Sequence, residues 1–257
     1  MTTTDEPAES ASFGGGHVSA AAMDLLWGTK PATGRGRKPG MTVERIVATA
    51  VELADQEGLD GLSMRRVADA LGVGTMSLYR YLPAKAELLE LMADAVMGER
   101  DLPEPHPDGW RAGLEAFARA SLEGYQRHPW LLTMSLTRGL LGPNQTAQLD
   151  SMLRVIAGTG LNNGELMATV GLIISYVQGR ARQLSDAAGA EQRTGVTDAQ
   201  FWTEFAPLLD QHLSADRFPT LAGLWKNADF EWLDEFDFGL QRVLDGIETY
   251  VEKKGRS

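Results

Sequence analysis

The apolar positions in the first third of the chain recur with the period of an α-helix. Between residues 42 and 57 they fall three or four positions apart, which places them on one face of a helix. Gly58 follows directly, and glycine is the residue that most often ends a helix. The same period returns after Pro83, so a further helix is expected from Lys85 onward. The apolar face of the first helix consists of Val43, Ile46, Val47, Ala50, Val51 and Ala54, and that of the later one of Leu88, Leu89, Met92, Ala95 and Val96.

Helical patterns also dominate the second half of the chain, where no segment shows the alternation of a β-strand. Residues 101–108 contain three prolines and indicate a boundary between two domains. The sequence therefore predicts an all-α protein with a flexible N-terminal extension (1–40), a smaller helical domain (41–100) and a larger helical domain (101–257). The helices expected in the larger domain span residues 109–127, 130–136, 144–158, 164–187, 197–213, 218–226 and 230–253.

Residues 63–85 have the pattern of two short helices joined by a tight turn. Ser63 can cap the first helix, and the glycines of the turn 72–74 can adopt the positive φ that a sharp change of direction requires. Thr75 can cap a second helix over residues 76–82, which must end near Pro83 because proline lacks the backbone N–H. Two short helices around a glycine-containing turn are typical of a helix-turn-helix.

The second helix of this motif is expected to carry an unusual surface. Only Leu78 is expected to be buried, while hydroxyl, aromatic and guanidinium groups surround it at Ser77, Tyr79, Arg80 and Tyr81. Such groups can hydrogen-bond the base edges and phosphates of a DNA major groove. The alternative is an ordinary helix surface. We interpret the motif as DNA-binding.

The N-terminal extension contains a compact basic segment just before the first helix. Arg35, Arg37 and Lys38 lie among prolines and glycines, so regular structure is not expected there. Arms of this kind enter the minor groove of DNA in several protein classes, and a solvated linker is the alternative. Residues 1–29 are rich in small polar residues and are expected to be mobile. Met23, Leu25, Leu26 and Trp27 form an apolar cluster within them, and the alternative is that this cluster docks on the rest of the protein.

The net charge of −11 is distributed unevenly along the chain. Residues 30–100 hold ten basic and ten acidic residues, whereas residues 101–257 hold fourteen and twenty-one. A local basic patch is what DNA phosphates meet, so the acidic total does not contradict DNA binding. The chain has no cysteine, no apolar run long enough to cross a membrane and no signal-peptide pattern in residues 1–29, so we expect a cytoplasmic protein.

Residues 42–92 resemble the tetracycline-repressor (TetR) family of bacterial transcription regulators. The resemblance is carried, in order, by a first helix closed by E-G, then L-S-M-R-R-V-A, L-G-V, S-L-Y-R-Y and K-x-E-L-L. It implies a homodimer that binds a palindromic operator in double-stranded DNA and releases it when a small ligand enters the C-terminal domain. The helical second domain has the length seen in the branch that includes the tetracycline repressor itself.

The resemblance also implies roles for individual residues. The recognition-helix contact positions correspond to Thr75, Met76, Ser77, Tyr79, Arg80 and Tyr81, with Arg65 on the preceding helix and Lys85 at the phosphate-contacting start of the next one. Arg65 or Arg80 can pair with guanine, and Met76 can touch a thymine methyl group. Tyr79 and Tyr81 are expected to bond phosphates.

Aromatic residues and methionines are frequent in the larger domain, where they can form either a plain core or a cavity for a small hydrophobic effector. The residues that we expect to line such a cavity are Phe117, Ser121, Trp130, Met134, Met152, Thr169, Ile173 and Tyr176. The helices 164–187 and 230–253 are more apolar than one partner requires, and a pair from each protomer is expected to form the dimer interface.

No constellation of residues indicates an enzyme, a cofactor or a metal site. The four histidines are scattered, and neither HExxH nor a phosphate-binding glycine motif occurs. We expect no catalytic residue and no metal ligand. The alternatives to a ligand-relieved repressor are a DNA-binding dimer without a small-molecule effector, an activator or co-repressor-dependent regulator, and a helical catalytic domain fused to a DNA-binding one.

Overall fold

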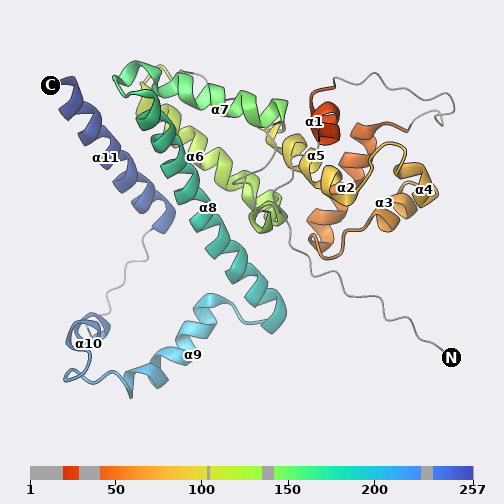
Figure 1. Cartoon of the computed structure of the whole chain (residues 1–257). Coiled ribbons are helices and arrows are strands. Elements are labelled where there is room, and N and C mark those ends of the chain that lie inside the picture. Colours follow the sequence, from red (N-terminus) through yellow and green to blue (C-terminus); the bar gives the residue numbers. More distant parts are fainter. Residues whose placement is uncertain (1–19, 29–40, 103–104, 135–141, 227–233, 257) are drawn as a thin grey trace.

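The computed structural model describes residues 20–28, 41–102, 105–134, 142–226 and 234–256 (Figure 1). Within these residues every regular element is a helix, so the all-α prediction is confirmed. The elements are α1 (Ala20–Leu26), α2 (Val43–Glu57), α3 (Met64–Ala70), α4 (Thr75–Leu78), α5 (Lys85–Met97), α6 (Trp110–Arg127), η1 (Pro129–Thr133), α7 (Pro143–Ile156), η3 (Ala157–Thr159), α8 (Asn163–Thr194), α9 (Asp198–Asp210), α10 (Pro219–Lys226) and α11 (Glu235–Gly255).

Helices α2–α5 form a small unit, called the head below, in which the predicted end of the first helix at Gly58 and the predicted cap at Ser63 are confirmed. The Thr42 hydroxyl accepts the Arg45 amide at 3.2 Å and caps α2, which ends at Gly58 with φ +72°. The Ser63 hydroxyl caps α3 in the same way. The centre of the head is fully closed to water and contains Ile46, Ala50, Leu62, Val67, Leu78, Leu82, Leu88 and Met92.

The second helix of the helix-turn-helix is shorter than predicted. Gly74, not Thr75, occupies the N-cap position, and α4 ends at Leu78. Tyr79, Arg80 and Tyr81 continue as hydrogen-bonded turns, with the Leu82 amide donating to the Leu78 carbonyl at 2.9 Å. Four residues form little more than one helical turn, so the packing of Leu78 and Leu82 holds this segment in place.

Part of the N-terminal extension is folded, which corrects the prediction that residues 1–29 are mobile. Helix α1 packs on α5 (Figure 1), and Leu26 is buried against Leu91 together with the half-buried Met23. Positions 23 and 26 lie three apart, so both side chains lie on the same face of a helix. The apolar cluster of the extension is therefore the face that docks α1. The basic segment with Arg35, Arg37 and Lys38 lies outside the described residues.

Helices α6–α11, called the body below, are built around α6 and the 32-residue helix α8 (Figure 1). Asn162 and Glu165 form a capping box at the start of α8. The helix was predicted to end at residue 187, but α8 continues to a left-handed C-cap at Gly195 with φ +69°. The segment expected as helix 130–136 contains the shorter 3-10 helix η1.

Helix α9 lies away from the rest of the body, as Figure 1 shows, and none of its residues is buried. Its aromatic side chains stack on one another in solvent: the ring centroids of Phe201 and Phe205 are 5.3 Å apart, and Trp202 packs against both. Apolar side chains are exposed on α10 as well, at Leu221 and Leu224.

Among the polar contacts between the head and the body in the described residues, two involve carboxylates of the head. On α2, Asp55 Oδ1 accepts Trp130 Nε1 at 2.7 Å and faces His128 Nδ1 at 2.8 Å, and the other ring nitrogen of His128 lies 3.0 Å from Glu99. On α5, Asp94 accepts the Gln145 amide at 3.0 Å at the start of α7. Buried residues supply both contacts, since Trp130, His128 and Asp94 are each less than one tenth exposed.

The packing of α11 on α8 predicts a stability effect that depends on pH. Lys254, the Asn162 amide and Tyr250 bond the Glu165 carboxylate and lower its pKa to about 2. A carboxyl with a depressed pKa stabilises the fold above its unfolded pKa, near 4.3, and loses this contribution as the pH falls toward 2. We therefore expect Glu165→Gln to lower the melting temperature at pH 7 and to match the wild type near pH 2.

Thermal unfolding at a series of pH values measures this effect, and Glu191→Gln, an exposed site near the other end of α8, is the matched control. A difference between Glu165→Gln and the wild type that stays constant from pH 7 to pH 2 contradicts the assigned role of the carboxylate.

Candidate DNA-binding surface and effector cavity

Helix α4 and the residues directly after it present a surface of exposed side chains around a buried anchor. Leu78 is fully buried, as predicted, whereas Met76 is 77% exposed and Tyr79 is 42% exposed. Arg80 is exposed beside them, and Thr75 and Ser77 are half-buried. The backbone of α3 and α4 thus holds three groups of different chemistry, a thioether, a phenol and a guanidinium, in one solvent-facing segment.

Tyr81 departs from the prediction of an exposed contact residue. It is only 9% exposed and belongs to the hydrophobic core of the chain. The reason is helical periodicity: residues 81 and 82 lie three and four positions after the buried Leu78, and both amides donate to the Leu78 carbonyl, so both side chains face the core with it. The expected exposure of Tyr81 is therefore wrong, and the phosphate bond predicted for its hydroxyl stays a prediction.

Arg65 and Arg66 are neighbours with different surroundings. The guanidinium of Arg66 bonds both carboxylate oxygens of Glu57 and donates to the Gly61 carbonyl at 3.0 Å, so it links α3 to the end of α2. The Arg65 side chain is 85% exposed and approaches only Asp69, at 3.9 Å. Arg65 is thus the more exposed member of the pair, and its contact with DNA stays a prediction.

Lys85 lies at the first position of α5, beside the helix-turn-helix. Its Nζ is 3.4 Å from the Leu59 carbonyl and the side chain is half-buried. Burial lowers the pKa of Lys85, and nearby Asp60 opposes that shift. The ammonium and the positive end of α5 lie together, an arrangement that favours a phosphate. The phosphate contact itself stays a prediction.

The basic segment before α2 gives a prediction that depends only on charge. Replacing Arg35, Arg37 and Lys38 together with alanine should weaken DNA binding and flatten its salt dependence, by about 0.9 in the slope of log K against log salt for each lost phosphate contact. Binding measured across a salt series gives this slope. Because α1 is packed on α5, the point substitutions are a cleaner test than deletion of residues 1–39. An unchanged slope would mean that the segment is a solvated linker.

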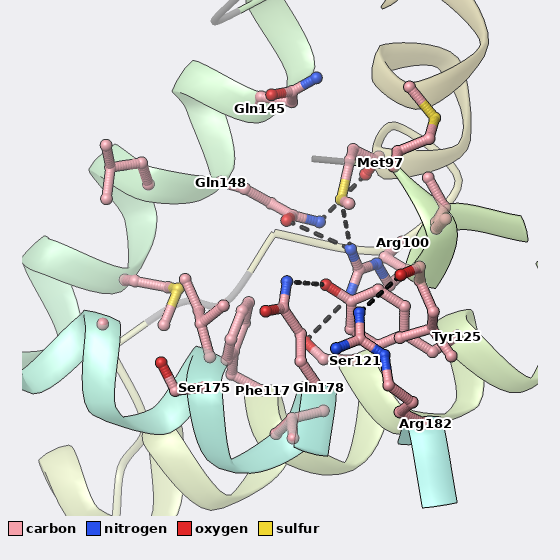
Figure 2. Close-up of a pocket in the computed structure, with 18 of the residues that line it drawn as sticks. Met97, Arg100, Phe117, Ser121, Tyr125, Gln145, Gln148, Ser175, Gln178 and Arg182 are labelled. Atoms are coloured by element: carbon pink, nitrogen blue, oxygen red, sulfur yellow. Dashed lines mark hydrogen bonds between the residues drawn. The ribbon is translucent and has the colours of Figure 1, made fainter. Parts of the chain in front are cut away.

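A cavity of about 760 Å³ lies in the body between α6, η1, α7 and α8 and is closed toward the head by the end of α5. This volume is in the range of sites for small organic molecules. Four of the eight residues predicted for an effector cavity line it, namely Phe117, Ser121, Met134 and Met152. Figure 2 shows Phe117 and Ser121 among the side chains that surround the space.

The other four predicted residues lie outside this lining. Trp130 bonds Asp55 of the head, and the Tyr176 hydroxyl donates to the Phe236 carbonyl at 2.7 Å, which fixes it against α11. Thr169 bonds the Glu165 carbonyl of its own helix, and Ile173 is fully buried in the core. Trp130, Ile173 and Tyr176 thus belong to packing between elements and Thr169 to its own helix, which is the plain-core alternative.

Polar residues that the sequence analysis did not select line the same cavity. Arg100 donates to Ser121 Oγ at 2.9 Å and to Gln148 Oε1 at 3.3 Å, and Gln178 donates to the Tyr125 hydroxyl at 3.0 Å (Figure 2). Arg182 donates to the Leu132 carbonyl at 2.6 Å. The sequence spacing could have pointed to two of them. Gln178 lies four positions after Ile174 and Arg182 four positions after Gln178, so all three lie on the same face of α8, which lines the cavity.

Within the described ranges, no group of three or more His, Asp or Glu side chains is placed to hold a metal ion. None of the described helices is long and apolar enough to cross a membrane.

Two protein-family models match the chain. The model for bacterial regulatory proteins of the tetR family matches residues 46–92, and the model for the tetracyclin repressor-like C-terminal domain matches residues 102–251. Among relatives, the chain is 47% identical to the HTH-type transcriptional repressor DrrR1 of Streptomyces coeruleorubidus over 240 residues, covering 93% of this chain and 89% of the relative.

An HTH-type transcriptional regulator of Saccharopolyspora erythraea is 31% identical, with 90% and 94% of the two chains covered. Among solved structures, apo ActR from Streptomyces coelicolor has a TM-score of 0.70 at 28% identity and covers 84% of this chain and 99% of that one. ActR in complex with actinorhodin has a TM-score of 0.70 at 30% identity, covering 81% and 96%. The helix-turn-helix, the helical second domain and these matches agree. The chain belongs to the tetR family of helix-turn-helix transcriptional regulators.

Proposed function

We propose that this protein is a homodimeric transcriptional repressor that binds a palindromic operator and is released from it by a small ligand in the body cavity. The observation that carries the proposal is the position of α5. This helix begins with Lys85 beside the helix-turn-helix and ends at Met97, which lines the cavity. A ligand that displaces the end of α5 therefore acts on the element that also supports the DNA-facing surface.

The division of labour follows the predicted boundaries, with DNA binding in residues 41–100 and effector binding and dimerisation in residues 101–257. We place the protein with its DNA in the cytoplasm. The name of the relative DrrR1 supports the sign of regulation, since that protein is a transcriptional repressor. ActR, whose fold is similar, has been seen with actinorhodin, which supports an organic effector for this chain too.

Dimerisation is proposed through α8 and α11, because both helices keep apolar side chains exposed after packing on one another. On α8, Met167 and Leu172 are about half exposed. On α11, Phe238 and Tyr250 are 51% and 50% exposed. A two-fold interface that covers these faces would bury them in a four-helix arrangement.

The runner-up is a DNA-binding dimer whose body has no small-molecule effector. A fully packed body would favour it, whereas a cavity of about 760 Å³ favours the ligand-relieved repressor. Footprinting of purified protein on the DNA flanking its own gene, across a salt series, tests the DNA-binding half. A protected palindrome that is lost on adding a ligand supports the whole proposal. If the palindrome is protected but no compound in a panel of aromatic natural products releases the protein, the runner-up is favoured.

A further inference from the structure

The effector cavity contains positive charge without a matching negative charge. Arg100 and Arg182 both line it, and no Asp or Glu is among its lining residues in the described part of the chain. Both side chains donate to uncharged acceptors there: Arg100 to a hydroxyl and an amide oxygen, and Arg182 to a backbone carbonyl. Guanidinium groups stay protonated, so the charge is permanent.

Arg100 is the more informative of the two. Its five N–H donors make three bonds within the described residues, to Ser121, Gln148 and the sulfur of Met97, and two donors have no protein acceptor there. The Gln148 amide nitrogen donates to the Met97 carbonyl at 3.0 Å, which turns its oxygen toward Arg100. Neutral groups thus hold Arg100 in place, and the guanidinium keeps N–H donors that a ligand can use.

The acid next to Arg100 in the sequence makes no direct ion pair with it in the described residues. The Glu99 carboxylate lies 3.2 Å from Arg127 and 3.0 Å from His128, at the junction with the head. A buried charge is costly unless an opposite charge and hydrogen bonds compensate it. Because no acidic side chain lines the cavity in the described part of the chain, a bound anion would supply the compensating charge.

We propose that the effector is an amphipathic anion: an apolar, aromatic body carrying a carboxylate or an ionised phenol whose oxygen binds Arg100. Apolar lining side chains such as Phe117, Met134, Met152 and Ile174 contact the body of such a molecule. Figure 2 shows Arg100, Tyr125 and Arg182 toward the same side of the cavity in this view, which makes one end of the site polar and positive. The inference rests on the proposed function of the cavity as the effector site.

The test compares two probes of the same shape and different charge: anthraquinone carboxylate and anthraquinone carboxamide. Their affinities for the full-length protein are measured by isothermal titration calorimetry at pH 7. We expect the carboxylate to bind at least about tenfold more tightly, because a hydrogen bond to a charged group is stronger than a neutral one. Equal affinity, or tighter binding of the carboxamide, overturns the proposal.

Variants assign the preference to Arg100. Arg100→Met should remove most of the charge preference while leaving carboxamide binding within about threefold, and Arg100→Lys should keep part of it. Arg154→Met, an exposed site on α7 outside the cavity lining, should behave as the wild type. A preference that Arg100→Met leaves unchanged, in protein whose circular dichroism is native, contradicts the assignment.

Failure of the proposed function gives a different pattern. If neither probe binds at millimolar concentration while operator DNA is still bound, the cavity is not an effector site and this inference falls with it. If both probes bind equally and release DNA, the repressor proposal stands and only the anionic effector is wrong.

Discussion

Replacing Tyr79 and Arg80 together with alanine is expected to abolish specific operator binding while leaving the protein folded. Both side chains are exposed on the turn that follows α4 and have no role in the buried core. A bidentate arginine–guanine pair contributes roughly 1–3 kcal/mol of discrimination, and a hydrogen bond to a charged phosphate contributes a further amount of about 1.5–3 kcal/mol. Together they predict a loss of at least about a hundredfold in specific affinity, since 1.4 kcal/mol corresponds to tenfold.

Binding to operator and to unrelated DNA, measured by fluorescence anisotropy, separates the two contributions of this pair. We expect operator affinity to fall to the level of unrelated DNA, because phosphate contacts from other residues remain. Arg154→Ala, which removes an equally exposed arginine from α7, is the matched control and should leave both affinities unchanged.

The free energy of unfolding should change by no more than about 0.5 kcal/mol in the double variant, as for other exposed sites. A double variant that unfolds would show that these side chains support the head. Unchanged operator binding in a folded variant would mean that other residues read the operator sequence.

The sequence predicted most of the head because its determinants are local. The apolar period, the caps at Thr42 and Ser63 and the glycines that end helices each act within a few residues. Tyr81 could also have been placed from the sequence, because three positions after Leu78 it lies on the same buried face of the helix. The apolar cluster of the extension is visible in the sequence, but its partner Leu91 is not, because it lies far along the chain.

In the body, the sequence identifies which residues are apolar but not which residues they contact. Phe117 and Met152 reach the cavity, whereas Trp130 and Tyr176 reach a carboxylate and a carbonyl on other elements. Arg100 and Arg182 were missed for the opposite reason. Arginine is usually a surface residue, and only the packing of α6, α7 and α8 gathers residues 100, 148 and 182 around one space.

The contact of Asp55 with Trp130 and His128 predicts the largest effect on stability. Asp55→Ala removes the acceptor for two side chains that are only 2% and 6% exposed. A buried polar group left without a partner costs roughly 1–3 kcal/mol. Because 29% of the Asp55 side chain is exposed, water can partly replace it, and we expect a loss of about 2 kcal/mol in the free energy of unfolding.

Urea unfolding followed by circular dichroism measures this loss, and two variants on α2 serve as comparisons. Glu52→Ala removes an exposed carboxylate one turn earlier and should be neutral within about 0.5 kcal/mol. Asp55→Asn keeps one oxygen acceptor and should lie between the wild type and Asp55→Ala. A loss in Glu52→Ala equal to that in Asp55→Ala would mean that charge on α2, and not the junction, determines stability.

A double-mutant cycle distinguishes this specific contact from a general weakening of α2. Trp130→Phe removes the indole N–H but keeps a buried ring, so its cost should shrink once Asp55 has already been replaced with alanine. Residues in direct contact typically show coupling of 0.5–3 kcal/mol, and about 1 kcal/mol is expected for this pair. A coupling of this size would show that the bond between Asp55 and Trp130 holds the head against the body. Effects of the two substitutions that simply add would show that Asp55 and Trp130 act independently and that the tie lies instead at Asp94.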